Sequence, residues 1–203
     1  MRDINILVFG DSITYGAWDK EKGGWVNRLR LALENDDSNS YYTIFNLGIS
    51  GDVTESIKNR FDNECKIRFN KNDNTIIIFS IGINDTQNVK DEDRVSLETF
   101  RNNIITLINS AKKYTDNILF IGLTKVDESK VTPLPWDKEK GYLNTKIINF
   151  DKELKNICLE NNVDYLYIYE LLEIEELFDG LHPNNVGHQK ICDKVKTKIS
   201  KYY

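Results

Sequence analysis

The chain has 203 residues, of which 40% are hydrophobic and 29% are charged, with a formal net charge of -5 at pH 7. This size and composition predict one compact domain over residues 1–203, large enough for an ordinary hydrophobic core. Its 27 Lys and Arg residues are scattered among 32 Asp and Glu residues instead of clustering, which argues against a nucleic-acid partner.

Apolar runs of strand length alternate with segments of helical periodicity along the chain. Runs typical of buried strands lie at residues 4–9, 43–47, 75–81, 118–123 and 163–168. Apolar stripes at helical spacing lie around residues 25–33, 57–65, 97–111, 147–158 and 188–199. Because parallel strands need crossover helices, we predict a three-layer α/β/α sandwich with a five-stranded parallel sheet in flavodoxin-like order. The long irregular segments are expected at residues 82–94, 124–142 and 173–183.

The first apolar run passes directly into the sequence Gly10-Asp11-Ser12-Ile13. A glycine allows an abrupt turn after a buried strand, and this turn would lift the Ser12 hydroxyl above the carboxyl edge of the sheet. Serine alone is a poor nucleophile. Ser12 is therefore a candidate nucleophile only if the chain also supplies a base, a residue that orients the base, and donors for an oxyanion.

The chain contains two histidines, and His182 fits the role of the base better. It lies in the turn-rich segment 179–184, ahead of the last predicted helix. Asp179, three positions earlier, can accept the Nδ1 proton of the imidazole and leave Nε2 to accept the proton of Ser12. His188 falls on the apolar stripe of that helix, which predicts a partly buried core histidine.

Two loops at predicted strand ends offer donors for an oxyanion. Gly51, after the second strand, can expose its backbone N–H because no side chain shields it. Asn84, after the third strand, carries an amide that can reach the same point. Asp11 and Asp85 lie beside candidate catalytic positions, and we expect their carboxylates to accept backbone N–H bonds and hold the two loops.

These sites form four short blocks that resemble those of the SGNH hydrolases, also called GDSL esterases and lipases. The blocks are Gly10-Asp11-Ser12, Ile49-Ser50-Gly51-Asp52, Gly82-Ile83-Asn84-Asp85, and Asp179 with His182. Each block alone is weak, whereas all of them in order at predicted strand ends are specific, and they span essentially the whole domain. Ile13 stands where the family motif has leucine, and Ile83 where a second glycine is frequent.

The resemblance implies a serine esterase that works through an acyl-enzyme. Ser12 would be the nucleophile, His182 the base and Asp179 its orienting partner. The backbone N–H groups of Ser12 and Gly51 and the side chain of Asn84 would form the oxyanion hole. We expect no metal or organic cofactor, because His182 protonates the leaving alkoxide and no redox step occurs.

The expected partner is a small-molecule acyl ester. Segment 124–142 carries several charges and offers no obvious apolar lid, which favours acetyl or other short-chain esters over long-chain lipids. Trp136 in this segment is a candidate substrate contact. Trp18 and Trp25 are further aromatic candidates for a pocket, although Trp25 begins a helical stripe and is expected in the core.

Alternatives remain open on the sequence alone. The same site could transfer the acyl group to an alcohol or a sugar, as an acyltransferase, or could act on lysophospholipids. A different class of function is a non-catalytic flavodoxin-like module that binds phosphate or a flavin at the same sheet edge. Asp11 places a carboxylate at that edge and no P-loop pattern follows the first strand, which disfavours the module.

The remaining observations concern location and thiol chemistry. The first apolar run begins at Ile4, which leaves no room for a signal peptide, and no run approaches the ~18 residues of a membrane span. We therefore expect a soluble cytoplasmic protein. The cysteines Cys65, Cys158 and Cys192 are far apart without CxxC spacing, which predicts buried free thiols instead of disulfides or a zinc site. The sequence indicates no oligomeric state.

Overall fold

The computed structural model describes residues 2–35, 40–90 and 92–203. Its centre is a five-stranded parallel sheet in the order β2-β1-β3-β6-β8. The strands are β1 (Arg2–Gly10), β2 (Ser40–Gly48), β3 (Asn74–Ser80), β6 (Ile118–Ile121) and β8 (Asp164–Leu166). The predicted α/β/α sandwich and its flavodoxin-like strand order are confirmed, and the strand ends differ from the predicted ones by a few residues.

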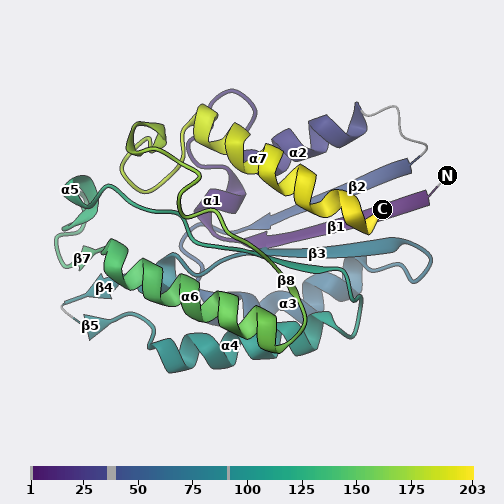
Figure 1. Cartoon of the computed structure of the whole chain (residues 1–203), viewed down its shortest axis with the longest axis horizontal. Coiled ribbons are helices and arrows are strands. Elements are labelled where there is room, and N and C mark those ends of the chain that lie inside the picture. Colours follow the sequence, from purple (N-terminus) through teal and green to yellow (C-terminus); the bar gives the residue numbers. More distant parts are fainter. Residues whose placement is uncertain (1, 36–39, 91) are drawn as a thin grey trace.

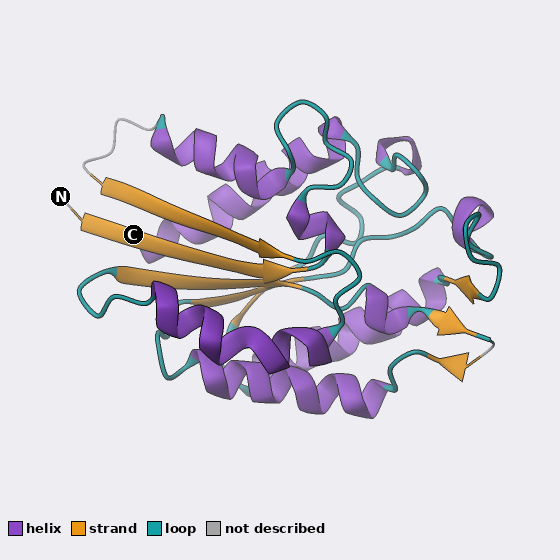
Figure 2. Ribbon diagram, turned by 180° about the vertical axis from the view of Figure 1, so that it is seen from behind, coloured by secondary structure: helices purple, strands orange, loops and turns teal. Residues whose placement is uncertain are grey.

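Helices cover both faces of the sheet (Figures 1 and 2). On one face α2 (Trp25–Glu34) packs against α7 (Asn185–Ile199), and on the other lie α3 (Thr54–Arg68), α4 (Leu97–Ala111) and α6 (Asn144–Glu160). The shorter helices are α1 (Ser12–Tyr15), α5 (Glu128–Val131), η1 (Asn84–Thr86), η2 (Ile174–Glu176) and η3 (Ser200–Tyr202). The buried residues of the long helices follow the predicted apolar stripes, so the sheet is enclosed from both sides.

A row of aromatic side chains links neighbouring strands in the core. Phe9 of β1, Phe79 of β3 and Phe120 of β6 occupy matching register positions. Their ring centroids are 5.6 Å apart for Phe9 and Phe79 and 4.6 Å apart for Phe79 and Phe120, and Phe61 of α3 packs 4.9 Å from Phe9. Because a slip of one residue would turn every ring to the other face, this row favours a single register.

The adjacent strands β2, β1 and β3 end at the same level. Gly10 pairs with Gly48 on one side and with Ser80 on the other. A Cβ atom on Gly10 would lie 2.0 Å from Thr14 Oγ1 and 2.4 Å from the Ser80 carbonyl oxygen, so this close approach requires glycine. The loops after these strands therefore begin side by side at the carboxyl edge of the sheet.

A second, antiparallel sheet lies beyond the carboxyl ends of the main strands (Figure 1). It joins β5 (Glu92–Asp93), β4 (Asn88–Val89) and β7 (Lys140–Gly141) in that order. The expectation that segments 82–94 and 124–142 are irregular is wrong where these strands pair and where η1 and α5 form. Strands of two residues are too short to show an alternating pattern, which is why the sequence does not reveal them.

The thiols lie in the helical layers. Cys65 on α3, Cys158 on α6 and Cys192 on α7 are buried and free, as predicted. In the three ranges that the structure describes, no helix is long and apolar enough to cross a membrane.

Candidate active site

Ser12 begins the short helix α1 immediately after the turn that ends β1. The Asp11 carboxylate caps this helix by accepting the backbone N–H of Ile13 at 2.9 Å. The Ile13 side chain is buried under the turn. Ser12 is 8% exposed and lines a cleft of about 1470 Å³. A firmly held turn thus presents the serine to the cleft.

A continuous row of hydrogen bonds joins Ser12, His182 and Asp179. Ser12 Oγ lies 2.8 Å from His182 Nε2, and His182 Nδ1 lies 2.8 Å from Asp179 Oδ2. Ser12 and His182 are 170 positions apart in the chain, so the segment between β8 and α7 must fold back over α1 to make the contact. A neutral imidazole bonded in this way carries its proton on Nδ1 and accepts at Nε2.

The Asp179 carboxylate is surrounded by donors. Its Oδ1 accepts the backbone N–H groups of Leu181 at 3.0 Å and of His182 at 2.8 Å. Burial alone would raise the pKa of Asp179, but the hydrogen bonds from the side chain and backbone of His182 outweigh it and hold that pKa well below its usual range. Asp179 is therefore negatively charged beside His182 at neutral pH.

Trp18 makes a contact that the sequence does not reveal. Its indole Nε1 donates to Asp179 Oδ2 at 3.1 Å, across 161 positions of the chain. The ring stands edge-on to His182 with centroids 6.3 Å apart, and Trp18 is 50% exposed along the cleft. Trp136 lines the same cleft and is largely exposed, whereas Trp25 is buried in the core, as predicted.

The predicted oxyanion donors line the cleft together with Ser12. Gly51 has a φ angle of 85°, and a Cβ atom added to it would meet nothing within 4 Å. Asn84 is buried, and its amide is held at both ends. Nδ2 donates to the Asp52 carbonyl at 3.0 Å, and Oδ1 accepts the Tyr142 hydroxyl at 2.8 Å. Because an amide nitrogen carries two hydrogens, one is left for an oxygen bound in the cleft.

The two neighbouring aspartates hold loops, as expected. Asp85 accepts both the backbone N–H and the hydroxyl of Thr54, the first residue of α3. Asp11 caps α1 through its bond to Ile13. Burial raises the pKa of Asp85 to about 6 and the pKa of Asp11 to about 7. Their carboxyl groups thus connect the site loops to the helices behind them.

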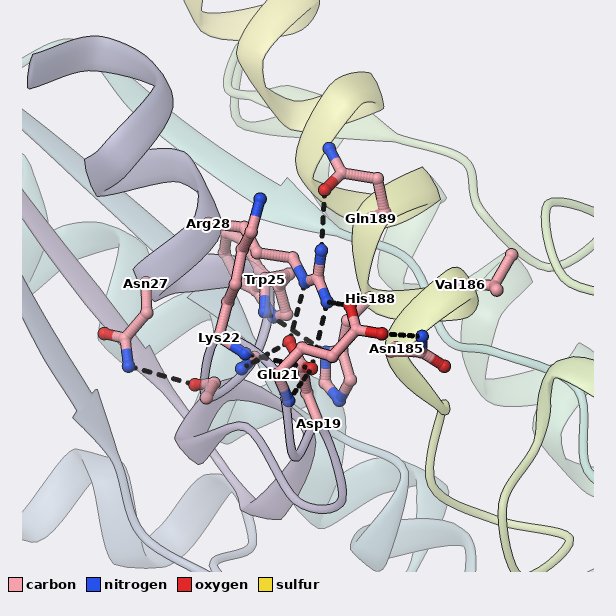
Figure 3. A network of polar contacts seen from close by, with 12 residues as sticks. Asp19, Glu21, Lys22, Trp25, Asn27, Arg28, Asn185, Val186, His188 and Gln189 are labelled. Atoms are coloured by element: carbon pink, nitrogen blue, oxygen red, sulfur yellow. Dashed lines mark hydrogen bonds and ion pairs between the residues drawn. The ribbon is translucent and has the colours of Figure 1, made fainter. Parts of the chain in front are cut away.

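Buried polar contacts anchor the loop that carries Trp18 to α2 and α7 (Figure 3). Arg28 of α2 pairs with Asp19 through Nε at 2.6 Å and Nη2 at 2.9 Å, and it also donates to Gln189 of α7 at 2.8 Å. The Arg28 and Asp19 side chains are 5% and 0% exposed. Burial alone would raise the pKa of Asp19, but the bonds from Arg28 and the loop backbone hold it well below its usual range.

His188 belongs to this anchor and lies apart from the row of Ser12. Its Nδ1 accepts the backbone N–H of Trp25 at 3.2 Å, so its Nε2 carries the proton and donates to the Ala17 carbonyl at 3.0 Å. Burial lowers the pKa of His188, which keeps the ring neutral. In the described part of the chain, no three or more His, Cys, Asp or Glu side chains gather as metal ligands.

The fold is a three-layer α/β/α sandwich, with the turn that carries Ser12 at the carboxyl edge of its sheet. The chain belongs to the GDSL-like lipase/acylhydrolase family, whose profile matches residues 8–190. It is therefore a carboxylic ester hydrolase, which decides against the non-catalytic binding module. No curated protein sequence matches the chain.

Several solved structures share the fold. An acetylxylan esterase from Geobacillus stearothermophilus is 20% identical, with 97% of this chain and 94% of that chain covered and a TM-score of 0.74. A lipase/acylhydrolase from Enterococcus faecalis is 23% identical, with 98% and 95% covered and a TM-score of 0.74. A lipolytic protein of the G-D-S-L family from Veillonella parvula is 19% identical, with 98% of both chains covered and a TM-score of 0.74. These likenesses concern the fold.

Proposed function

We propose that this ester hydrolase cleaves small or short-chain acyl esters, acetyl esters foremost, through a triad of Ser12, His182 and Asp179. The observation that carries the proposal is the pair of 2.8 Å contacts that run from Ser12 Oγ through the His182 ring to Asp179 Oδ2. Nucleophilic catalysis by serine requires a hydroxyl within reach of a base whose second nitrogen is held by a carboxylate.

Acylation begins when Ser12 Oγ attacks the ester carbonyl carbon. His182 Nε2 takes the hydroxyl proton during the attack, and the charged Asp179 stabilises the imidazolium that forms. When the tetrahedral intermediate collapses, His182 gives this proton to the leaving alkoxide. The products of this half are a free alcohol and an ester between the acyl group and Ser12.

The negative oxygen of the tetrahedral intermediate needs donors that are already in place. We assign this role to the backbone N–H groups of Ser12 and Gly51 and to Nδ2 of Asn84. All these residues line the same cleft. Loss of one such donor typically costs on the order of 10²- to 10³-fold in kcat.

Deacylation repeats the chemistry with water in place of the alcohol. His182 removes a proton from a water molecule, which attacks the acyl carbon, and then returns that proton to Ser12 Oγ. The oxyanion donors act a second time. A carboxylic acid leaves, and the enzyme is regenerated.

The wall of the cleft supports a small acyl group on a polar alcohol. Its lining includes the exposed aromatic rings of Tyr15, Trp18 and Trp136 as well as the amide side chains of Asn27 and Asn46. We assign Trp136 a contact with the alcohol portion of the substrate. Among the similar structures is an acetylxylan esterase, and two further structures of that esterase are described as catalytic mutants with a serine or a histidine replaced by alanine.

The proposal is tested with p-nitrophenyl acetate, butyrate, octanoate and laurate, together with acetylated xylooligosaccharides. We expect kcat/KM to be highest for acetate or butyrate and to fall with chain length. Ser12→Ala should lose at least about a thousandfold in kcat. Ser110→Ala, a serine of α4, serves as the matched control and should retain activity.

Each of two results would contradict a different part of the proposal. Undiminished hydrolysis by Ser12→Ala would remove Ser12 from the mechanism, and a preference for laurate would remove the short-chain assignment. Product analysis with an added alcohol measures how much of the acyl group goes to water. More transfer product than acid at modest alcohol concentration would make the protein an acyltransferase.

A further inference from the structure

Asn84 belongs to a series of hydrogen bonds that starts at a guanidinium and ends at the Asp52 carbonyl. Arg94 Nη1 donates to Gln87 Oε1 at 3.3 Å, and Gln87 Nε2 donates to the Tyr142 hydroxyl at 3.0 Å. The Tyr142 hydroxyl donates to Asn84 Oδ1 at 2.8 Å, and Asn84 Nδ2 donates to the Asp52 carbonyl at 3.0 Å. Every bond in the series runs in the same direction.

The two ends of the series fix this direction. A guanidinium has no acceptor, so Gln87 must turn its oxygen to Arg94 and its nitrogen to Tyr142. The hydroxyl of Tyr142 then has one proton left to give, and burial raises the pKa of Tyr142, so this proton is retained. Only the oxygen of Asn84 can accept it. The nitrogen of Asn84 is thereby directed to the Asp52 carbonyl and the cleft.

Burial makes the series costly to break. Gln87, Tyr142 and Asn84 are 4%, 2% and 5% exposed. A flipped Asn84 amide would turn its oxygen to the Asp52 carbonyl oxygen and would leave the buried Tyr142 hydroxyl without an acceptor, and unpaired polar groups away from water are unfavourable.

The small antiparallel sheet brings the members of the series together. Asn88 of β4 pairs with Gly141 of β7, which places the adjoining Gln87 and Tyr142 within reach of each other. Across the β4–β5 turn, the Arg94 backbone N–H donates to the Gln87 carbonyl at 3.0 Å. This sheet lies outside the four motif blocks.

Arg94 also touches the other loop that we assign to the oxyanion hole. Its Nη2 donates to the Gly51 carbonyl at 3.0 Å. One guanidinium therefore contacts the Gly51 loop directly and the Asn84 loop through Gln87 and Tyr142.

We propose that Arg94, Gln87 and Tyr142 are positioning residues, a relay that orients the Asn84 amide so that an Nδ2 hydrogen faces the oxyanion of the reaction. The relay rests on the proposed function, because it acts through Asn84. A flipped amide would present its oxygen to the developing negative charge and would repel it. Holding the donor in place beforehand avoids reorganisation during the reaction, which is the main source of oxyanion stabilisation.

The test is a double-mutant cycle of Tyr142→Phe and Asn84→Ala with p-nitrophenyl acetate. Because Tyr142→Phe leaves Asn84 in place but free to turn, it should lower kcat by roughly 10- to 100-fold, less than the loss of the whole donor, with KM within about twofold of wild type. In the Asn84→Ala background the same substitution should change kcat by less than about twofold.

Two further variants separate positioning from general damage. In Gln87→Glu the carboxylate can only accept, so it would draw the Tyr142 proton away from Asn84, and kcat should fall about as far as in Tyr142→Phe. Tyr165→Phe is the matched control, because it removes a part-buried hydroxyl bond from Tyr165 to Asp151, at 2.6 Å, and neither residue lines the cleft. It should lower thermal stability and leave kcat unchanged.

The outcomes distinguish the relay from the function on which it rests. If replacing Ser12 or Asn84 with alanine leaves kcat at the wild-type value, the proposed function is wrong, and the relay with it. If Asn84→Ala is impaired while Tyr142→Phe matches wild type, or costs the same factor in both backgrounds, the relay is wrong and the proposed function stands.

Discussion

The indole of Trp18 donates a hydrogen bond of 3.1 Å to Oδ2 of Asp179, the same oxygen that bonds Nδ1 of His182. A carboxylate oxygen that accepts two hydrogen bonds interacts less strongly with each donor than it would with one donor alone. The loop that carries Trp18 is in turn anchored by Arg28 and His188. A contact outside the sequence motifs therefore bears on how strongly Asp179 acts on the proposed base.

Replacing Trp18 with phenylalanine keeps an aromatic wall and removes the donor. Asp179 then stabilises the imidazolium that forms on His182 during the attack more strongly. We expect kcat for p-nitrophenyl acetate, measured at one fixed pH, to rise by roughly two- to fivefold. Ser110→Ala is the control and should leave kcat unchanged. An unchanged or lower kcat in Trp18→Phe would refute the coupling.

The buried pair of Arg28 and Asp19 should contribute to stability far more than an exposed pair on the same helix. Asp19→Ala leaves the buried guanidinium with only the exposed carboxylate of Glu21, at 3.0 Å, and we expect the free energy of unfolding to fall by about 3 kcal/mol. Glu34→Ala breaks the exposed pair of Arg30 and Glu34 and should change it by at most about 0.5 kcal/mol. Urea denaturation measures both, and equal losses would contradict the anchor.

Asp11 should make stability depend on pH. Burial raises the pKa of its carboxyl group to about 7 in the folded chain, against about 4 in an unfolded one. Because the folded pKa is raised, this contribution is fully present below about pH 4 and is lost as the pH rises to about 7.

Asp11→Asn removes this titration and keeps an acceptor for the Ile13 N–H. Its free energy of unfolding should therefore decline less than that of wild type between pH 4 and pH 7.5, by on the order of 1–4 kcal/mol at about 1.4 kcal/mol per pKa unit. Denaturant titrations at both pH values supply the comparison. Parallel changes in the two proteins would show that Asp11 does not titrate in this window.

The layers of the fold and the members of the site follow from local patterns in the sequence. Buried strands such as residues 75–81 are continuous apolar runs, and each is followed by a glycine-containing loop, so the carboxyl edge could be located without coordinates. Asp179 and His182 are close in sequence, and a tight turn accounts for their contact. Ser12 could be paired with His182 because the other histidine lies on a helical stripe.

The remaining contacts depend on how distant loops approach each other. Nothing in the sequence indicates that Trp18 contacts Asp179, because an exposed tryptophan can line any wall of a cleft. Tyr142 reaches Asn84 only because β4 and β7 pair, and strands of two residues leave no periodic signal. The residues that we propose as oxyanion donors could thus be predicted as neighbours at the cleft, whereas the contacts that orient them could not.

The central claim, that His182 activates Ser12 as the nucleophile, is tested most directly by covalent capture with a fluorophosphonate, read out by intact mass and peptide mapping. We predict that the wild type takes up a single phosphonyl group on Ser12. His182→Ala should react at least about a hundredfold more slowly, and Ser12→Ala should gain no mass. An adduct on another residue, or labelling of Ser12→Ala at the wild-type rate, would contradict the account.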